Sequence, residues 1–411
     1  MSGSKELAYA AVLTCSVRRS AGKWVRLVMS SLQRLSAFLA QDPGNPELAC
    51  EVFDQHFAAG SFAEARGTLE PLPEEGQALV SVRFRYARLD LVTGEYRRAE
   101  DNLVCLQATG HDGPTIAHDI VFAQLCQRNL DGAHASLETA LTRHGETAAL
   151  RILQARIALM RKDYAAAQAA LDDALRLDPA DATTQGLRAL AWLDAGDEAQ
   201  ALNIAAACLA QHPDQHEALL AAGTASLWRG DAQLAGQHYG RALDRFPNSG
   251  RALSGMGQCH MLAGDLDQAR TTLERAVVAM PDHVGTWHAL AWIQLLSGEL
   301  AIAEKSYLEA LDLDRNFAES HGGLAVVALL DERYEEGEDA MKRALRLDPA
   351  CVSGRYARSL WLQHTGEHDA ADAIFAELMR AGAMPGISDE DARVAAQRVR
   401  ERATAQRGGR R

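Results

Sequence analysis

The sequence has no long uninterrupted run of apolar residues, although 47% of its 411 residues are hydrophobic. A helix that crosses a bilayer needs about 20 consecutive, mostly apolar residues, so we expect no transmembrane segment and a cytoplasmic location. Positive charge is also scarce, because the sequence has 42 Lys and Arg residues but 55 Asp and Glu residues, which gives a formal net charge of −13. Nucleic acids and anionic membranes bind basic surfaces, so neither is expected as the main partner.

Motifs for catalysis and metal binding are missing as well. The sequence contains no HExxH, no GxSxG and no glycine-rich phosphate-binding loop. Its 7 cysteines are scattered without a CxxC pair, and free cysteine commonly behaves as a small buried apolar residue. We therefore expect no enzyme activity, no catalytic residue, no cofactor and no metal site.

Small residues recur in this chain with a fixed period of 34 positions. They are Ala65, Ala99, Ala133, Ala167, Ala201, Ala235, Ala269, Ala303, Gly337 and Ala371. A second row follows seven positions later and includes Ala140, Ala174, Cys208, Ala242, Ala276, Ala310 and Ala344. A period of this length is typical of a structural unit that is copied and stacked along the chain. Small residues at fixed points would let the helices of such units approach closely.

Other residue types keep the same period and mark the ends of helices. Proline recurs at Pro179, Pro213, Pro247, Pro281 and Pro349, and glycine recurs at Gly60, Gly94, Gly196, Gly230, Gly264, Gly298 and Gly366. Because proline cannot continue a helix and glycine tolerates the left-handed conformation of a helix C-terminus, each copy is predicted as helix, turn, helix and stop. The residue after the glycine position is a candidate N-cap of the second helix in six copies. These residues are Ser61, Asn129, Asp163, Asp197, Asp231 and Asp265.

The copy at residues 250–283 resembles the tetratricopeptide repeat, since its Leu, Gly, Ala and Pro residues stand at that family's offsets. About ten such copies cover residues 46–385. The resemblance implies an all-α fold, a right-handed α-solenoid of about ten 34-residue helix-turn-helix repeats. It also implies a capping helix at each end, at residues 29–45 and in an Arg-rich segment at residues 386–411 that ends in a frayed tail.

Residues 1–28 differ from the repeats and leave three interpretations open. They are a disordered extension or a mis-assigned start before Met29, an ordered helix around Trp24 that caps the first repeat, or a weak export signal. The third interpretation would place the protein in the periplasm.

The resemblance further implies that side chains from the first helix of each repeat line a concave groove. These groove candidates are Phe84, Arg88, His118, Phe122, Ile152, Arg156, Trp228, Arg251, Gln258, His288, Trp292 and Tyr356. Leu190, Leu220 and Met261 share their register and are equally suited to packing between helices. Aromatic and Arg side chains are frequent binding hot spots, so a segment with acidic and apolar side chains would fit. The Asn residues with which related co-chaperones grip a C-terminal carboxylate do not occur at the matching positions.

These features predict a non-catalytic scaffold or adaptor that binds a protein or peptide in the groove. One alternative is a regulatory subunit that recruits or positions an enzyme, such as a glycosyltransferase or part of a secretion or assembly machinery. An RNA-binding solenoid is less favoured because the repeats are acidic. The Ala-, Arg- and Leu-rich composition with little Lys suggests a bacterial source, and the oligomeric state is left open.

Overall fold

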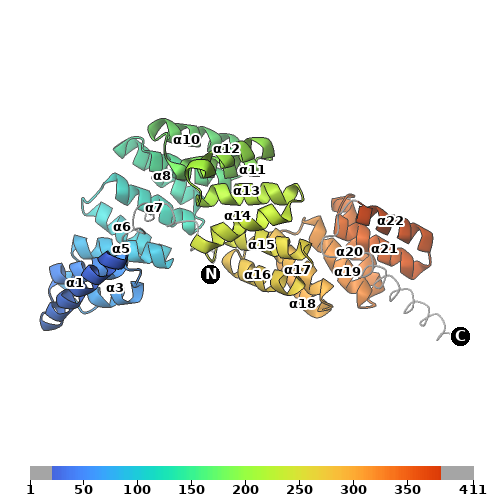
Figure 1. Ribbon diagram of the computed structural model, residues 1–411, viewed down its shortest axis with the longest axis horizontal. Helices are drawn as coiled ribbons and strands as arrows, with labels where there is room; N and C mark the ends of the chain where they lie inside the picture. Colours follow the sequence, from blue (N-terminus) through green and yellow to red (C-terminus); the bar gives the residue numbers. More distant parts are fainter. Residues whose placement is uncertain (1–20, 381–411) are drawn as a thin grey trace. The chain divides into compact units, whose positions relative to one another are not determined.

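The computed structural model describes residues 21–380, and in that range the chain forms helices and no strands (Figure 1). The predicted all-α class is confirmed. The first helix begins at Ala21, within the segment predicted as an extension or as an early cap. The remainder of that segment, residues 1–20, lies outside the described residues, as do residues 381–385 of the predicted repeats and the predicted C-terminal cap at residues 386–411.

The described helices belong to two compact units, which cover residues 21–221 and 222–380. The first unit contains α1 (Ala21–Gln41), α2 (Pro46–Ala58), α3 (Phe62–Leu69), α4 (Glu74–Gln77), α5 (Val80–Thr93), α6 (Tyr96–Ala108), α7 (Pro114–Cys126), α8 (Leu130–His144), α9 (Ala148–Met160), α10 (Tyr164–Leu177), α11 (Ala182–Asp194) and α12 (Glu198–Gln211). The chain passes from one unit to the other within α13 (His216–Trp228). The second unit contains α14 (Ala232–Arg245), α15 (Gly250–Leu262), α16 (Leu266–Ala279), α17 (Val284–Leu296), α18 (Leu300–Leu313), α19 (Ala318–Leu330), α20 (Tyr334–Leu347), α21 (Val352–Thr365) and α22 (His368–Arg380).

Apart from α1 and the single-turn α4, the helices form successive pairs joined by short turns, and consecutive helices within a unit lie side by side (Figure 1). The small residues of the 34-residue period lie where the two helices of a pair meet. All nine alanines of the first row are 0% exposed. At the tenth position, Gly337, a Cβ atom would lie 2.7 Å from Cγ of Leu329. The helices are therefore too close at these points for a larger residue.

Two tyrosines show how the packing adjusts to local residue size. The ring of Tyr239 lies so close to α15 that a Cβ on Gly255 would be 2.2 Å from its Cζ atom. In the same way, a Cβ on Gly323 would be 2.3 Å from the ring of Tyr307. Both tyrosines are buried at one repeat position, and each glycine stands 16 residues further on in the next first helix. A tyrosine ring at this position in one copy therefore requires a glycine at the facing position of the following copy.

The turn within each pair has one backbone position in the left-handed region. The seven predicted glycines adopt φ between 76° and 96° there. Three copies lack the glycine, and in them Arg128, Lys162 and Glu332 adopt the same conformation at φ of 61°, 59° and 66°. Since a side chain makes this conformation unfavourable, the turn geometry is imposed by the packed helices on either side of it.

The predicted N-caps of the second helices are largely confirmed. The side chains of Asn129, Asp163, Asp197, Asp231 and Asp265 each accept a hydrogen bond from the backbone amide three residues further on. The exception is Ser61, whose side chain makes no cap hydrogen bond. The described cysteines are free, as predicted, and four of them are buried.

The left-handed turn positions generate a stability prediction. Lys162→Gly should raise the free energy of unfolding by about 0.5–1 kcal/mol, because it removes the steric cost of a side chain at φ of 59°. The reciprocal change, Gly196→Ala, should lower it by about 1 kcal/mol through the backbone alone, since no atom lies within 4 Å of the added Cβ. Urea unfolding measures both, and a loss of stability in Lys162→Gly would contradict the assignment.

Candidate functional site

The predicted groove residues do not form one continuous exposed surface. Phe122, Trp292 and Tyr356 are only 6%, 6% and 3% exposed. The ring of Phe122 packs edge-on against Tyr96 with centroids 6.4 Å apart, and Trp292 packs edge-on against Tyr356 at 6.3 Å. The sequence did not reveal this burial, because a buried aromatic and a ligand-binding aromatic share the same helical register. These rings stabilise the contacts between helices of the chain itself.

The remaining groove candidates also include both buried and exposed side chains. Leu190, Leu220 and Met261 are 9%, 5% and 6% exposed, so the packing role considered for them applies. Trp228, at the end of α13, is by contrast 58% exposed. In the second unit Arg251, Gln258 and His288 are partly exposed.

The side chain of Arg156 already has a carboxylate partner within its own unit. Its Nη2 lies 3.0 Å from Oε1 of Glu217, and the two side chains are only 13% and 15% exposed. The amide of Gln215 donates to the other Glu217 oxygen at 2.6 Å. The Gln215 side chain reaches this place because residue 186 is glycine, where a Cβ would lie 1.8 Å from Oε1 of Gln215. This polar group joins α9 to α13 across α11.

Three accessible candidates in the first unit share one repeat position, and a fourth, Arg88, lies one turn further on. Phe84, His118 and Ile152 occupy the same position in three consecutive copies, on α5, α7 and α9, and each is partly exposed. Arg88, one turn after Phe84, holds its guanidinium 4.9 Å from the centre of the Phe57 ring. His118 stacks on Phe122 with centroids 6.3 Å apart and contacts Asp119 at 2.9 Å. These four side chains are accessible groove candidates of the first unit.

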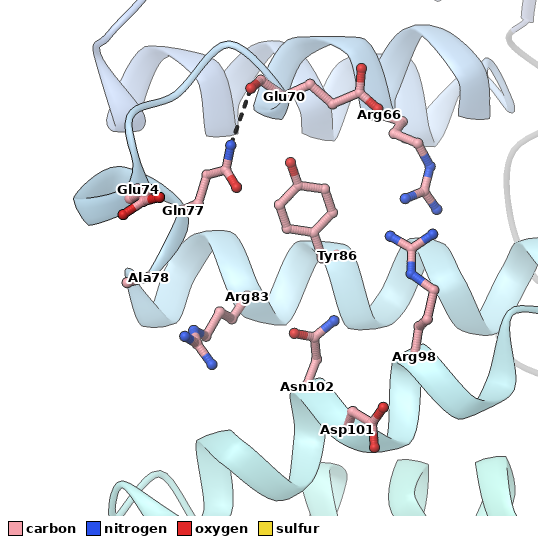
Figure 2. A pocket seen from close by; sticks show the side chains of 10 residues that line it. All are labelled: Arg66, Glu70, Glu74, Gln77, Ala78, Arg83, Tyr86, Arg98, Asp101 and Asn102. Atoms are coloured by element: carbon pink, nitrogen blue, oxygen red, sulfur yellow. Dashed lines mark hydrogen bonds between the residues drawn. The ribbon is translucent and has the colours of Figure 1, made fainter.

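A polar pocket that the sequence analysis missed lies among α3, α4, α5 and α6, with a volume of about 520 Å³. Its lining side chains come from all four helices, and Figure 2 shows Tyr86 standing between them. The pocket exists because α3 is cut short: it has 8 residues, whereas the second helix of every other described pair has 13 to 15. Pro71 and Pro73 follow its end and prevent another helical turn. These two prolines, which lie outside the repeat register, are the sequence feature from which the shortened helix and the pocket could have been predicted.

A buried carboxylate lies behind one end of this pocket. Asp90 on α5 is 0% exposed and forms an ion pair with Arg66 of α3. Its second oxygen, Oδ2, makes no hydrogen bond and lies 3.9 Å from Nε of Arg98 on α6. Burial, and secondly the nearby Glu70 carboxylate, raise the pKa of Tyr86, so its hydroxyl keeps its proton and can donate.

Comparison with known proteins identifies the repeats. Two family models, both described as tetratricopeptide repeat, match this chain, one over residues 226–293 and the other over residues 123–182 and 288–350. The chain is a tetratricopeptide repeat protein. No curated protein sequence matches it. The tetratricopeptide repeat makes it a protein-interaction scaffold in general terms, and among the described helices none is long and apolar enough to span a bilayer.

Solved structures resemble this tetratricopeptide repeat protein in fold alone. The human IFIT1 dimer with m7Gppp-AAAA is 16% identical, with a TM-score of 0.50, and the match covers 93% of this chain and 99% of that one. A monomeric IFIT1 mutant with Gppp-AAAA is also 16% identical, with a TM-score of 0.51, and the match covers 82% of this chain and 91% of that one.

The Arg156–Glu217 pair makes the stability of this tetratricopeptide repeat protein depend on pH. Burial alone would raise the pKa of Glu217, but Arg156 and the neighbouring His216 lower it below the usual value of 4.5 on balance. A lowered carboxyl pKa stabilises the fold above pH of about 4.5, and this contribution disappears as pH falls through the folded-state pKa.

Glu217→Gln should therefore lower the free energy of unfolding by about 3 kcal/mol at pH 7, because it leaves a mostly buried Arg156 without its counter-ion. The difference from the wild-type chain should shrink as pH falls below about 4.5. Glu146→Gln is the matched control, because Glu146 pairs with Arg151 but is 53% exposed, and it should cost less than about 1 kcal/mol. A pH-independent difference for Glu217→Gln would contradict the assignment.

Proposed function

We propose that this tetratricopeptide repeat protein is a non-catalytic adaptor that holds a polypeptide segment on α5, α7 and α9 of its first unit. The observation that carries the proposal is the shared register of three partly exposed side chains, Phe84, His118 and Ile152, on these first helices of consecutive repeats. A segment laid across them would meet the three side chains in turn.

The chemistry of this surface suits a segment with apolar and acidic side chains. Phe84 and Ile152 offer apolar contact area, and Arg88 offers a planar guanidinium that can bind a carboxylate with two hydrogen bonds. Because the guanidinium lies over the Phe57 ring, its orientation is held before a partner arrives. Pre-ordered side chains lose less conformational entropy on binding, which favours affinity.

The IFIT1 structures that resemble this fold contain Gppp-AAAA or m7Gppp-AAAA, so RNA is the alternative ligand to consider. For the present chain the net charge of −13 argues against it, because binding to a phosphate backbone depends on clustered Lys and Arg. We therefore propose a polypeptide as the ligand. A regulatory subunit bound to one enzyme would use the same surface and differs only in the identity of its partner.

The proposed surface can be tested with the double variant Phe84→Ala/Arg88→Ala in affinity capture from the source cells. Each lost hot spot should cost on the order of 2 kcal/mol, so a micromolar partner should no longer be recovered. Arg176→Ala on α10 is the control, because that side chain is 73% exposed and belongs to a second helix, not to the first helices α5, α7 and α9 that carry the surface. It should recover the same partners as the wild-type chain.

Circular dichroism melting of both variants separates loss of binding from loss of fold. If the double variant melts early, His118→Ala provides a milder change on the same surface. Equal recovery of partners by wild-type chain and folded variants would show that this surface is not where partners bind. Recovery of one enzyme in equal molar amount would identify the adaptor as its regulatory subunit.

A further inference from the structure

The charges at one end of the α3–α6 pocket leave room for a single negative charge. Figure 2 shows the guanidinium groups of Arg66 and Arg98 presented to each other across the pocket. Two such groups repel each other unless an anion lies between or beside them. The buried carboxylate of Asp90 pairs with Arg66 and is 3.9 Å from Arg98, so it offsets one of the two positive charges. The three side chains together carry a net charge of +1.

Arg98 is the group left to bind a ligand. Its side chain is 58% exposed, and its Nε contact to Asp90, at 3.9 Å, is longer than a hydrogen bond. The donors of its guanidinium therefore remain available on the pocket side. The hydroxyl of Tyr86 and the amide of Asn102, which also line the pocket, add neutral donors beside it.

The rim of the pocket has the opposite charge. Three exposed carboxylates line it: Glu70 directly after α3, Glu74 on α4 and Asp101 on α6. Arg83 of α5 also lines the pocket and is partly exposed, so these four side chains carry a net charge of −2. Within the described part of the chain, none of these carboxylates takes part in an ion pair. A dianion such as inorganic phosphate would be attracted by Arg98 but repelled by the rim, whose three carboxylates outnumber Arg83. A ligand with one acidic group and a nearby cation would satisfy both sets of charges.

We infer that this pocket binds a mixed-charge peptide segment, with its acidic side chain between Arg66 and Arg98 and a neighbouring basic side chain at the rim carboxylates. The inference rests on the proposed function, because it takes a polypeptide to be the ligand. A volume of about 520 Å³ admits a few side chains and falls within the usual range for binding pockets. The pocket then selects partners by charge, apart from the Phe84 surface.

The test uses a random heptapeptide library displayed on phage and selected on the full chain. The enriched heptapeptides should contain an acidic and a basic residue. The best one is then synthesised with a fluorophore, and its Kd is measured by anisotropy against the wild-type chain, Arg98→Ala and the control Arg176→Ala. Arg98→Ala should weaken binding at least tenfold and Arg176→Ala should not, and both should fold because these arginines are largely exposed.

A double-mutant cycle assigns the contact. Replacing the acidic residue of the peptide by its amide should weaken binding to the wild-type chain about tenfold and have little further effect on Arg98→Ala. Millimolar inorganic phosphate should not compete. Additive effects in the cycle, equal binding by Arg98→Ala, or enriched peptides without charged residues would overturn the inference.

The Phe84 variant separates the two proposals. If Phe84→Ala/Arg88→Ala weakens binding of the peptide and Arg98→Ala does not, the proposed function stands and the pocket inference fails. The reverse pattern supports the pocket and leaves the Phe84 surface to be decided by the affinity-capture experiment.

Discussion

The close approach of neighbouring helices is the constraint on which the rest of this structure depends. A side chain larger than methyl cannot fit at the crossings of the first row, where the alanines are completely buried and Gly337 lies against Leu329. Because each helix pair contacts mainly its neighbours in sequence, the same condition is repeated along both units. The turns are a consequence: helices held this close force one residue per turn into the left-handed region, even where it is Arg128, Lys162 or Glu332.

The sequence predicted what depends on this repetition. Helix pairs, the buried small residues, the left-handed glycines and five N-caps all follow from residue types at fixed offsets. It did not predict which groove candidates are exposed, because Phe84 and Tyr356 occupy the same repeat position, yet Tyr356 is buried against Trp292 whereas Phe84 is partly exposed. The partner of Arg156 was also hidden, since Glu217 is 61 residues away, and so was the role of Gly186, which leaves space for the Gln215 amide that donates to Glu217.

One departure from the period creates a second candidate binding feature beside the Phe84 surface. Two prolines end α3 early, and the missing helical turn leaves a polar pocket with three arginines and three rim carboxylates. Regular repeats bury their apolar faces against each other, whereas the irregular first pair gathers charged side chains around an opening. This supports partner selection there.

The central claim is that residue size at the helix crossings is matched between neighbouring copies, and Gly323 tests it most directly. Urea unfolding of Gly323→Ala should show a loss of about 1–3 kcal/mol, because the added Cβ would lie 2.3 Å from the Tyr307 ring. The same change in a Tyr307→Leu chain should be neutral or stabilising, since alanine favours the helix over glycine by about 1 kcal/mol. Gly236→Ala on α14, with no atom within 4 Å of the new Cβ, should stabilise the chain in the same way. An equal cost of Gly323→Ala with Tyr307 and with Leu at that position would contradict the account.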